Sequence, residues 1–261
     1  ITGNLAALVQ TINAQSSLIE ATRTAAAADG TGGRILASDY STKAQIALRG
    51  GTKTLSSDGF ASALNSIASQ SVQIVVPIST SDAVHEKVKA HCEFVAGSGA
   101  SLGGGERNAY VGTAAGKALI GADSLGSRAA ALNSRHVSLV GQQIRVTLPD
   151  GSLETLDPPF LALAIAGAQG GTEVGTPLTG KYMNVIDTFN AASWSPDVDA
   201  TTAIQNGVTI LVNGRLGKKI ERSITTYLTD DNPVFSEMSA NESLNTCIRP
   251  SLFLRGLGWH T

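Results

Sequence analysis

The feature of this sequence that most constrains its fold is an alternation of apolar and amphipathic segments between residues 58 and 140. Some segments place apolar residues at helical spacing, and the short runs between them are largely apolar. We therefore expect helices over residues 58–68, 82–96 and 115–132, and strands over residues 72–78, 108–112 and 137–140. Because apolar strands that alternate with helices are typical of parallel sheets, this pattern predicts an α/β fold with helices on both faces of a mostly parallel sheet.

Turn sequences organise the chain beyond this region. Pro149-Asp150-Gly151 separates two strand-like segments, 143–146 and 152–156, and so predicts a hairpin. Pro158-Pro159 precedes the apolar stretch 160–168, which reads as a buried helix with proline in its first turn.

The last third of the sequence predicts a further α+β region. Helices are expected near Thr201 and from about Phe235. Strands are expected over 208–212 and 219–226, joined at Asn213-Gly214, because Asn-Gly between apolar runs is a strong hairpin signal.

The first 50 residues predict a small α+β module. Apolar positions recur at helical spacing over residues 4–14, and short strands are expected over 18–24, 34–38 and 45–48. The composition changes at Gly50-Gly51, which marks the expected boundary of this module.

Composition excludes several classes of function. The sequence has 19 Lys and Arg residues against 21 Asp and Glu residues, so it offers no large electropositive field for nucleic acid. Charged residues make up 15% of the chain, against roughly 25% in an average soluble protein, and so neutral a surface tolerates close neighbours. No apolar run is long enough to span a bilayer and no signal segment opens the chain, so we expect a soluble protein that is not exported. Cys92 and Cys247 are expected to be buried free thiols.

Two glycine-rich segments resemble nucleotide loops only in part. Gly112 to Ala118 is expected to follow a strand and open a helix, but three residues separate its glycines and Ala118 has no hydroxyl for a magnesium ion. The loop 97–103 precedes a strand, whereas a dinucleotide fingerprint follows one. We therefore expect no cofactor.

The titratable residues form no catalytic or metal-binding pattern. On the helix expected over 82–96, His85 and His91 face different ways, and only His85 and Cys92 share a face. A Ser-His-Asp enzyme could draw only on His85, His91, His136 and His260, and no G-x-S-x-G elbow precedes an expected helix. The carboxylate pairs Asp197/Asp199 and Asp230/Asp231 are explained by turns and helix caps. The prediction is no catalytic residue, no metal site and no enzyme.

Several segments resemble the tail sheath family of contractile phages, pyocins and related injection machines. The best match is residues 206–210, Asn-Gly-Val-Thr-Ile, followed by residues 222–227, Arg-Ser-Ile-Thr-Thr-Tyr, which are similar to two segments of the family's C-terminal domain. Residues 47–52, Ala-Leu-Arg-Gly-Gly-Thr, resemble the family's passage into its core domain, and 11–14 with 17–22 resemble the close of its inserted outer domain.

A looser match covers the middle of the chain. Pro158-Pro159, Ala166-Gly167 and Gly175-Thr176-Pro177 with Lys181 are similar to a proline- and glycine-bearing stretch of the family, with Phe160 in place of its usual serine. The resemblance implies a subtilisin-like α/β core without protease function. It divides the chain into the end of an inserted outer α+β domain (1–50), the sheath core domain (51–198) and an incomplete C-terminal α+β domain (199–261).

The resemblance also implies a mechanical role. Sheath proteins of this family stack as hexameric rings in a helix around a tail tube, joined by terminal arms that add strands to neighbouring sheets. The expected partners are further copies of the chain, the tail tube protein, and the baseplate and tail terminator proteins, with no nucleic acid and no membrane insertion. The expected location is a virion tail that is assembled in the host cytoplasm and contracts to eject the genome.

Within this chain, the strand expected over 219–226 is the candidate to accept a neighbour's arm. The candidate residues for a subunit or tube interface are Lys218, Lys219, Arg222, Thr225, Arg249 and Arg255. Ordinary solvated or intramolecularly paired charges are the simpler explanation for any one of the cations.

Three alternatives stay open. The chain could be the sheath of a type VI secretion system or of another contractile injection system. It could be an α/β hydrolase-like or flavodoxin-like enzyme whose Asp, Ser and His meet only in space. It could also be a different virion component, although tube proteins are generally smaller and richer in β-structure.

Overall fold

The computed structural model describes residues 57–97, 105–229 and 236–246. They belong to the unit Leu55–Thr261, one of two into which the chain divides. The α+β module expected in residues 1–50 lies outside the described residues.

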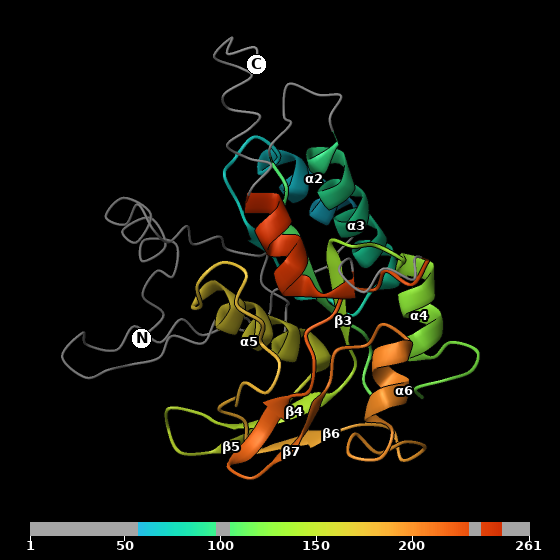
Figure 1. The fold of residues 1–261 in the computed structure, drawn as a ribbon, viewed down its shortest axis with the longest axis vertical. Helices are drawn as coiled ribbons and strands as arrows, with labels where there is room; N and C mark the ends of the chain where they lie inside the picture. The colour runs from blue at the N-terminus through green and yellow to red at the C-terminus, as the bar shows by residue number, and fades with distance from the viewer. Residues whose placement is uncertain (1–56, 98–104, 230–235, 247–261) are drawn as a thin grey trace, which may run out of the picture. The chain divides into compact units, whose positions relative to one another are not determined.

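A parallel sheet organises the described chain (Figure 1). Its order is β1 (Ile74–Val75), β2 (Asn108–Gly112) and β3 (Val137–Val140), with Ile74 opposite Asn108 and Ala109 opposite Val137. The expected α/β fold with a parallel sheet is confirmed. The bounds of β2 and β3 match the prediction, whereas β1 covers only two of the residues expected over 72–78.

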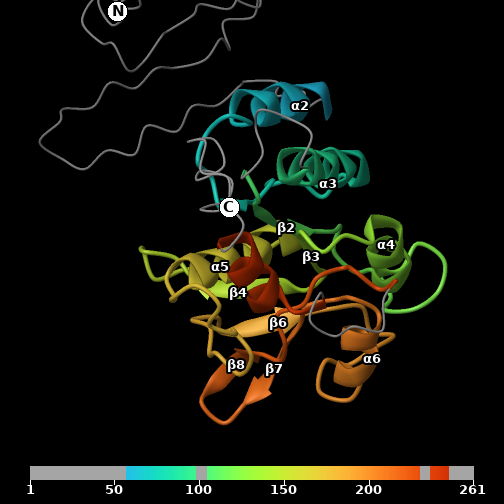
Figure 2. The same cartoon turned by 45° about the horizontal axis from the view of Figure 1, so that its top comes forward.

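Helices cover both faces of this sheet, as Figure 2 shows. Ala109 and Val111 face a cluster formed with α2 (Ser57–Ser66), α3 (Asp82–Ala96) and α4 (Leu125–Leu132). Tyr110 points to the opposite face, where it packs with Leu161 and Ile165 of α5 (Pro158–Gly170). The alternation of strand side chains therefore separates two hydrophobic cores.

A buried arginine joins α2, α3 and β2. The Arg107 side chain is fully buried, and its guanidinium donates to the carbonyls of Ile67, Ala68 and Gln70, which follow α2. It also contacts His91 Nε2 on α3 at 3.0 Å. A buried cation is tolerated only when hydrogen bonds replace its water, and these carbonyls do so.

The helix expected over residues 115–132 begins only at Leu125, so that prediction was wrong in its first part. Gly116, Gly121 and Asp123 have φ values of 75°, 112° and 53°, which a right-handed helix cannot contain. The side chain of Ser124 then accepts the Ser127 N–H and completes a capping box, which fixes the helix start.

The predicted hairpin is confirmed as the strands β4 (Gln143–Thr147) and β5 (Leu153–Leu156). β6 (Asp187–Phe189), which the sequence pattern did not reveal, pairs with the other side of β4, giving an antiparallel sheet of order β5-β4-β6. Gly151 makes the turn with φ of 83°, and Asp150 accepts the Ser152 N–H there.

The C-terminal part contains α6 (Ala200–Gln205), β7 (Leu211–Gly214) and β8 (Gly217–Ile220), followed by helical residues 236–246. Gly214 pairs with Gly217, so the turn lies at Arg215-Leu216 and not at Asn213-Gly214.

The strand expected over 219–226 was also wrong in extent, since regular pairing ends at Ile220. The segment before β7 bridges to the central sheet instead, with Val208 opposite Leu139 in parallel.

The start of α5 packs directly on the end of β2. A Cβ atom added to Gly112 would lie 2.2 Å from the backbone nitrogen of Pro159 and 2.6 Å from the carbonyl oxygen of Pro158. Both contacts are to backbone atoms, which cannot move aside without shifting the helix. Only glycine therefore fits at the carboxyl end of β2.

We predict that Gly112→Ala lowers the free energy of unfolding by more than about 2 kcal/mol, because overpacking at this contact displaces α5. Urea unfolding followed by circular dichroism measures the change. Gly170→Ala, whose added Cβ would lie 3.8 Å from Ile74 Cδ1, is the matched control and should stay within about 1 kcal/mol of wild type. Equal stability of the two variants would contradict this account of the β2–α5 contact.

Candidate functional site

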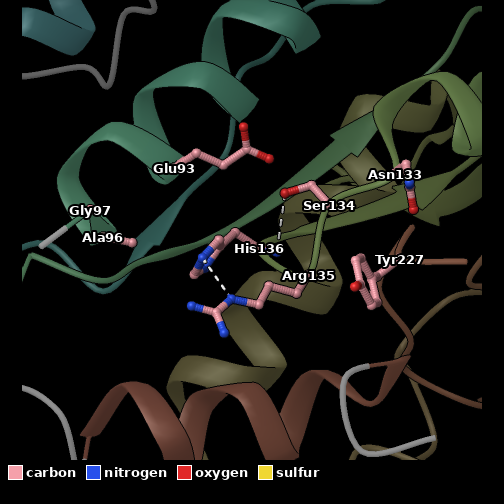
Figure 3. A pocket seen from close by; sticks show the side chains of 8 residues that line it. All are labelled: Glu93, Ala96, Gly97, Asn133, Ser134, Arg135, His136 and Tyr227. Atoms are coloured by element: carbon pink, nitrogen blue, oxygen red, sulfur yellow. Dashed lines mark hydrogen bonds between the residues drawn. The ribbon is translucent and has the colours of Figure 1, made fainter. Parts of the chain in front are cut away.

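A shallow pocket lies beside the amino end of β3 (Figure 3). Its volume is about 400 Å³, and its lining comes from the end of α3, the loop before β3 and Tyr227. The lining residues are Glu93, Ala96, Gly97, Asn133, Ser134, Arg135, His136 and Tyr227.

The side chains of the pocket do not form a catalytic relay. Arg135 Nε donates to His136 Nε2 over 3.2 Å, while the buried His136 Nδ1 has no hydrogen-bond partner. The Ser134 hydroxyl accepts the backbone N–H of His136 and does not bond to its ring. Figure 3 shows the Glu93 carboxylate and the Arg135 guanidinium on opposite sides of that ring.

Burial, helped by the charge of Arg135, lowers the pKa of His136 to about 4. An imidazole with so low a pKa is a weak base at neutral pH. The pocket therefore offers a polar recess and no activated nucleophile or base.

The position of the pocket also differs from that of α/β active sites. In open α/β sheets, ligands bind outside the carboxyl ends of the strands, whereas this pocket adjoins the amino end of β3. At the carboxyl end of β2, Gly112 lies in close backbone contact with Pro158 and Pro159 at the start of α5.

The structure separates the other residues considered as metal ligands. His85 Nε2 contacts the Ser79 carbonyl oxygen at 2.9 Å, whereas His91 contacts Arg107. Burial lowers the pKa of both histidines and raises the pKa of the Cys92 thiol to about 12. In the described ranges, no group of three or more His, Cys, Asp and Glu side chains is placed to hold a metal ion.

The segment from Gly112 to Ala118 does not open a helix, so that expectation was wrong. Its lysine, Lys117, forms an ion pair with Asp123 in the loop before α4. Asp197 accepts the Asn213 backbone N–H, and Asp199 accepts the Ser195 N–H, both over 2.8 Å, so these carboxylates order turns. Asp230 and Asp231 lie outside the described residues, and so does His260.

The segments most similar to sheath proteins meet in a buried polar junction. Thr209 Oγ1 accepts the Ile224 N–H and donates to the Ile224 carbonyl, over 3.1 and 3.2 Å. The same hydroxyl contacts Ser138 Oγ of β3 at 2.9 Å. One buried threonine therefore ties segments 206–210 and 222–227 to each other and to the central sheet.

The rest of segment 222–227 extends this junction. The Thr226 N–H donates to the Val137 carbonyl over 2.8 Å, and its hydroxyl bonds to the backbone of Ser134. The Thr225 N–H donates to the Ser236 carbonyl over 2.8 Å, at the start of the helical residues 236–246. The segment thus anchors the C-terminal helix to β3.

The predicted interface residues occupy different environments. Lys218 pairs with Asp187 at 2.9 Å, Lys219 pairs with Glu221 at 3.2 Å, and Arg222 pairs with Glu237. Thr225 is fully buried, so it could influence an interface only by positioning its segment. Arg249 and Arg255 lie outside the described residues.

Both edges of the β7–β8 hairpin are already engaged. The Met183 N–H donates to the Lys218 carbonyl, and the Ile220 N–H donates to the Lys181 carbonyl, over 2.8 and 2.9 Å. On the other side, the Gln142 side chain bonds to both backbone groups of Leu211. An incoming arm would have to displace the segment around residues 181–183 to pair with β8.

No sequence pattern predicted these contacts. The residues around 181–183 show neither strand alternation nor turn residues that predict their position beside β8. Gln142 is a polar residue two positions after an apolar strand, which is the one hint of its role in the sequence.

We predict that Thr209→Val lowers the free energy of unfolding by about 1–3 kcal/mol, because it leaves the buried Ile224 N–H and the Ser138 hydroxyl with fewer partners. Thr155→Val is the matched control, since Thr155 is exposed on β5 and should change stability by less than about 0.5 kcal/mol. Chemical denaturation measures both. If Thr209→Val were as neutral as the control, the junction would not depend on this hydroxyl.

We predict that stability falls as the pH is lowered from about 6.5 towards 4. In this window the unfolded chain protonates His136 while the folded chain keeps it neutral, so unfolding takes up a proton. Between pH 7 and pH 5 the loss should be about 2 kcal/mol larger for wild type than for His136→Gln. Urea unfolding across this range tests it. His85 and His91 remain in both proteins, so parallel curves would show that His136 is not the group responsible.

Comparisons with known proteins find a similarity of structure but not of sequence. No protein-family model matches the sequence, and neither does any curated protein. The structure is similar to a sheath tail protein from Desulfitobacterium hafniense, with a TM-score of 0.61 and 16% identity over 79% of this chain and 45% of that one. A sheath tail protein from Listeria innocua gives a TM-score of 0.56 and 17% identity, over 77% of this chain and 42% of that one.

The contracted helical sheath of the anti-feeding prophage is also similar, with a TM-score of 0.54 and 12% identity over 80% of this chain and 54% of that one. The chain thus spans less than half the length of the two sheath tail proteins. At such low identities the likeness concerns the fold. In the part that the structure describes, the chain has the fold of tail sheath proteins.

Proposed function

We propose that this chain is a structural subunit of a contractile tail sheath. It polymerises as stacked hexameric rings around a tail tube, and the sheath contracts to drive the tube through a host envelope for genome ejection. The observation that carries this proposal is the structural match over 79% of the chain to a sheath tail protein. The buried junction of segments 206–210 and 222–227 supports it, because the residues that resemble the family are those that hold this fold together.

The proposal includes the domain division and the partners. Residues 1–50 end an inserted outer domain, 51–198 form a core of subtilisin-like topology, and 199–261 belong to a C-terminal domain. The partners are further copies of the chain, the tube protein, and the baseplate and terminator proteins. Assembly takes place in the host cytoplasm, and the product is a virion tail.

The energy for contraction would be stored during assembly. An extended lattice that is kinetically trapped can release free energy once, when contraction buries more complementary surface, without a nucleotide. The described core agrees with such a role, because Lys117, the lysine of the glycine-rich segment 112–118, pairs with Asp123.

Five cations are the proposed contacts to the tube or to a neighbouring subunit, and the three that the structure describes, Lys218, Lys219 and Arg222, lie in β8 or two positions after it. Lys219 and Arg222 keep 31% and 41% of their side-chain surface exposed while they pair with Glu221 and Glu237. Ion pairs this exposed are worth less than about 1 kcal/mol, so they can exchange for partners on another chain. Lys218, Arg249 and Arg255 complete this set.

A sheath of a type VI secretion system or another contractile injection system is the second candidate, because the anti-feeding prophage sheath shares the fold. Genes for a capsid and a terminase near the coding sequence would favour a phage. The enzyme alternative would need a catalytic base in a pocket, and the pocket near His136 supplies a poor one, because burial lowers the pKa of His136 to about 4.

The first test is negative-stain electron microscopy of the protein expressed alone with all of its native sequence. Striated hollow tubes or hexameric rings are the expected result. Uniform monomers would count against the sheath and return attention to the pocket.

We predict that Lys219→Glu combined with Arg222→Glu leaves the subunit folded but reduces tube formation at least about 10-fold. The proposal pairs these two cations with carboxylates of a neighbouring surface, and the introduced carboxylates would be repelled by them. Sedimentation and microscopy measure assembly, and circular dichroism measures folding. Lys89→Glu on α3 is the control for added negative charge. Equal assembly of the double variant and the control would remove these two cations from the interface.

A further inference from the structure

The buried Arg107 uses every hydrogen-bond donor that it has. A guanidinium carries five N–H groups, and this one has five acceptors at the matching nitrogens. The acceptors are His91 Nε2 and four backbone carbonyls, those of Gly105, Ile67, Ala68 and Gln70. Because the side chain is fully buried, a donor that lost its acceptor would remain unpaired away from water.

The contact between Arg107 and His91 requires a neutral imidazole. A guanidinium has no lone pair and stays protonated in proteins, so His91 Nε2 must be the acceptor at 3.0 Å. The ring proton of the neutral His91 therefore lies on Nδ1, and a second proton could bind only at Nε2. A proton there would place two cations in contact and remove one acceptor from the buried guanidinium.

No carboxylate in the described chain offsets a second proton on His91. Lys87 lies one turn before it on α3 and adds a further positive charge, while Glu93 lies about 200° around the helix and is exposed. Glu106, on the segment that leads into β2, is buried but forms no ion pair with His91. Burial and the positive charge of Arg107 therefore lower the pKa of His91.

Helix α2 depends on this junction for its attachment. The described side chains of α2 bury only Leu64, whereas α3 buries six residues. Phe60 and Ile67 pack against the same core but are only partly buried. Residues 59–73 contain no charged side chain, so no ion pair from them holds α2 in place. The hydrogen bonds from Arg107 to the carbonyls after α2 are therefore a large part of what joins this helix to the sheet.

We propose that His91 and Arg107 form an acid-sensitive latch, in which uptake of a proton by His91 releases α2 and residues 67–70 while the rest of the described core stays folded. Release exposes both side chains to water, which replaces the lost hydrogen bonds and lets both be charged. The open form thus binds a proton that the closed form excludes.

The direction of the pH response follows from this difference. The closed form loses stability as the pH falls from about 6.5 towards the lowered pKa of His91 in the fold. Since α2 is the first helix after the boundary between Thr54 and Leu55, its release would lengthen the chain that connects the two units. This inference concerns the subunit itself and does not depend on the proposed sheath function.

Hydrogen exchange of the whole chain at pH 7.5 and pH 5.5, read by NMR, tests the proposal. Protection factors are compared, because they exclude the intrinsic pH dependence of amide exchange. In wild type we expect the protection of α2 to fall about 3- to 10-fold at pH 5.5 relative to that of α5. His91→Gln should abolish this fall, since glutamine can accept a hydrogen bond from Arg107 but does not titrate.

A second variant and a second measurement complete the test. His85→Gln is the matched control, because His85 is another buried histidine of α3 and contacts the Ser79 carbonyl, and it should keep the response of α2. NMR titration of His91 in wild type should show Nε2 without a proton at pH 7.5 and a midpoint that coincides with the response of α2. This titration decides the question even if His91→Gln fails to fold.

Each other result would overturn the proposal. Protection of α2 that does not change with pH in wild type would show that no latch exists. A fall that persists in His91→Gln, or that has a different midpoint from the titration of His91, would assign the response to another group. Equal loss of protection in α2 and α5 would show that the whole core opens and not α2 alone.

Discussion

The burial of β2 on both faces is the constraint on which the rest of this structure depends. Ala109 and Val111 close one core and Tyr110 the other, so helices must cover both sides of the strand. Its two ends are fixed as firmly, because Arg107 binds the carbonyls after α2 and Gly112 admits the start of α5.

Sequence periodicity predicted the helices and strands whose apolar residues lie on one face. The bounds of α3 agree with the prediction because its apolar residues, from Val84 to Val95, follow helical spacing and a serine precedes them. Prediction failed where backbone conformation outweighed composition. The loop before α4 is rich in Ala and Gly, but positive φ values at Gly116 and Asp123 exclude a helix. Likewise, Asn213-Gly214 reads as a hairpin turn, yet cross-strand pairing moves the turn to Arg215-Leu216.

The candidate sites were predictable only where the contacts are local. Sequence reasoning identified segments 206–210 and 222–227 by resemblance, but the hydroxyl of Thr209 that joins them acts across 15 positions, and no local pattern encodes such a contact. The pocket near His136 was missed for the same reason, since its lining comes from α3, the loop before β3 and Tyr227. The carboxylate partners of Lys218 and Arg222 follow from the packing of the second sheet and of the C-terminal helix.

The ion pairs within the described chain constrain how its cations can bind a partner. Lys117, Arg128, Lys218, Lys219 and Arg222 each pair with a carboxylate of the same chain, in a protein with 15% charged residues. Ion pairs of this kind at the surface are worth less than about 1 kcal/mol, so a carboxylate on another chain can replace the partner within this chain at little cost. The proposed contacts of Lys219 and Arg222 depend on such an exchange, because both cations are already paired and both keep part of their side chain exposed.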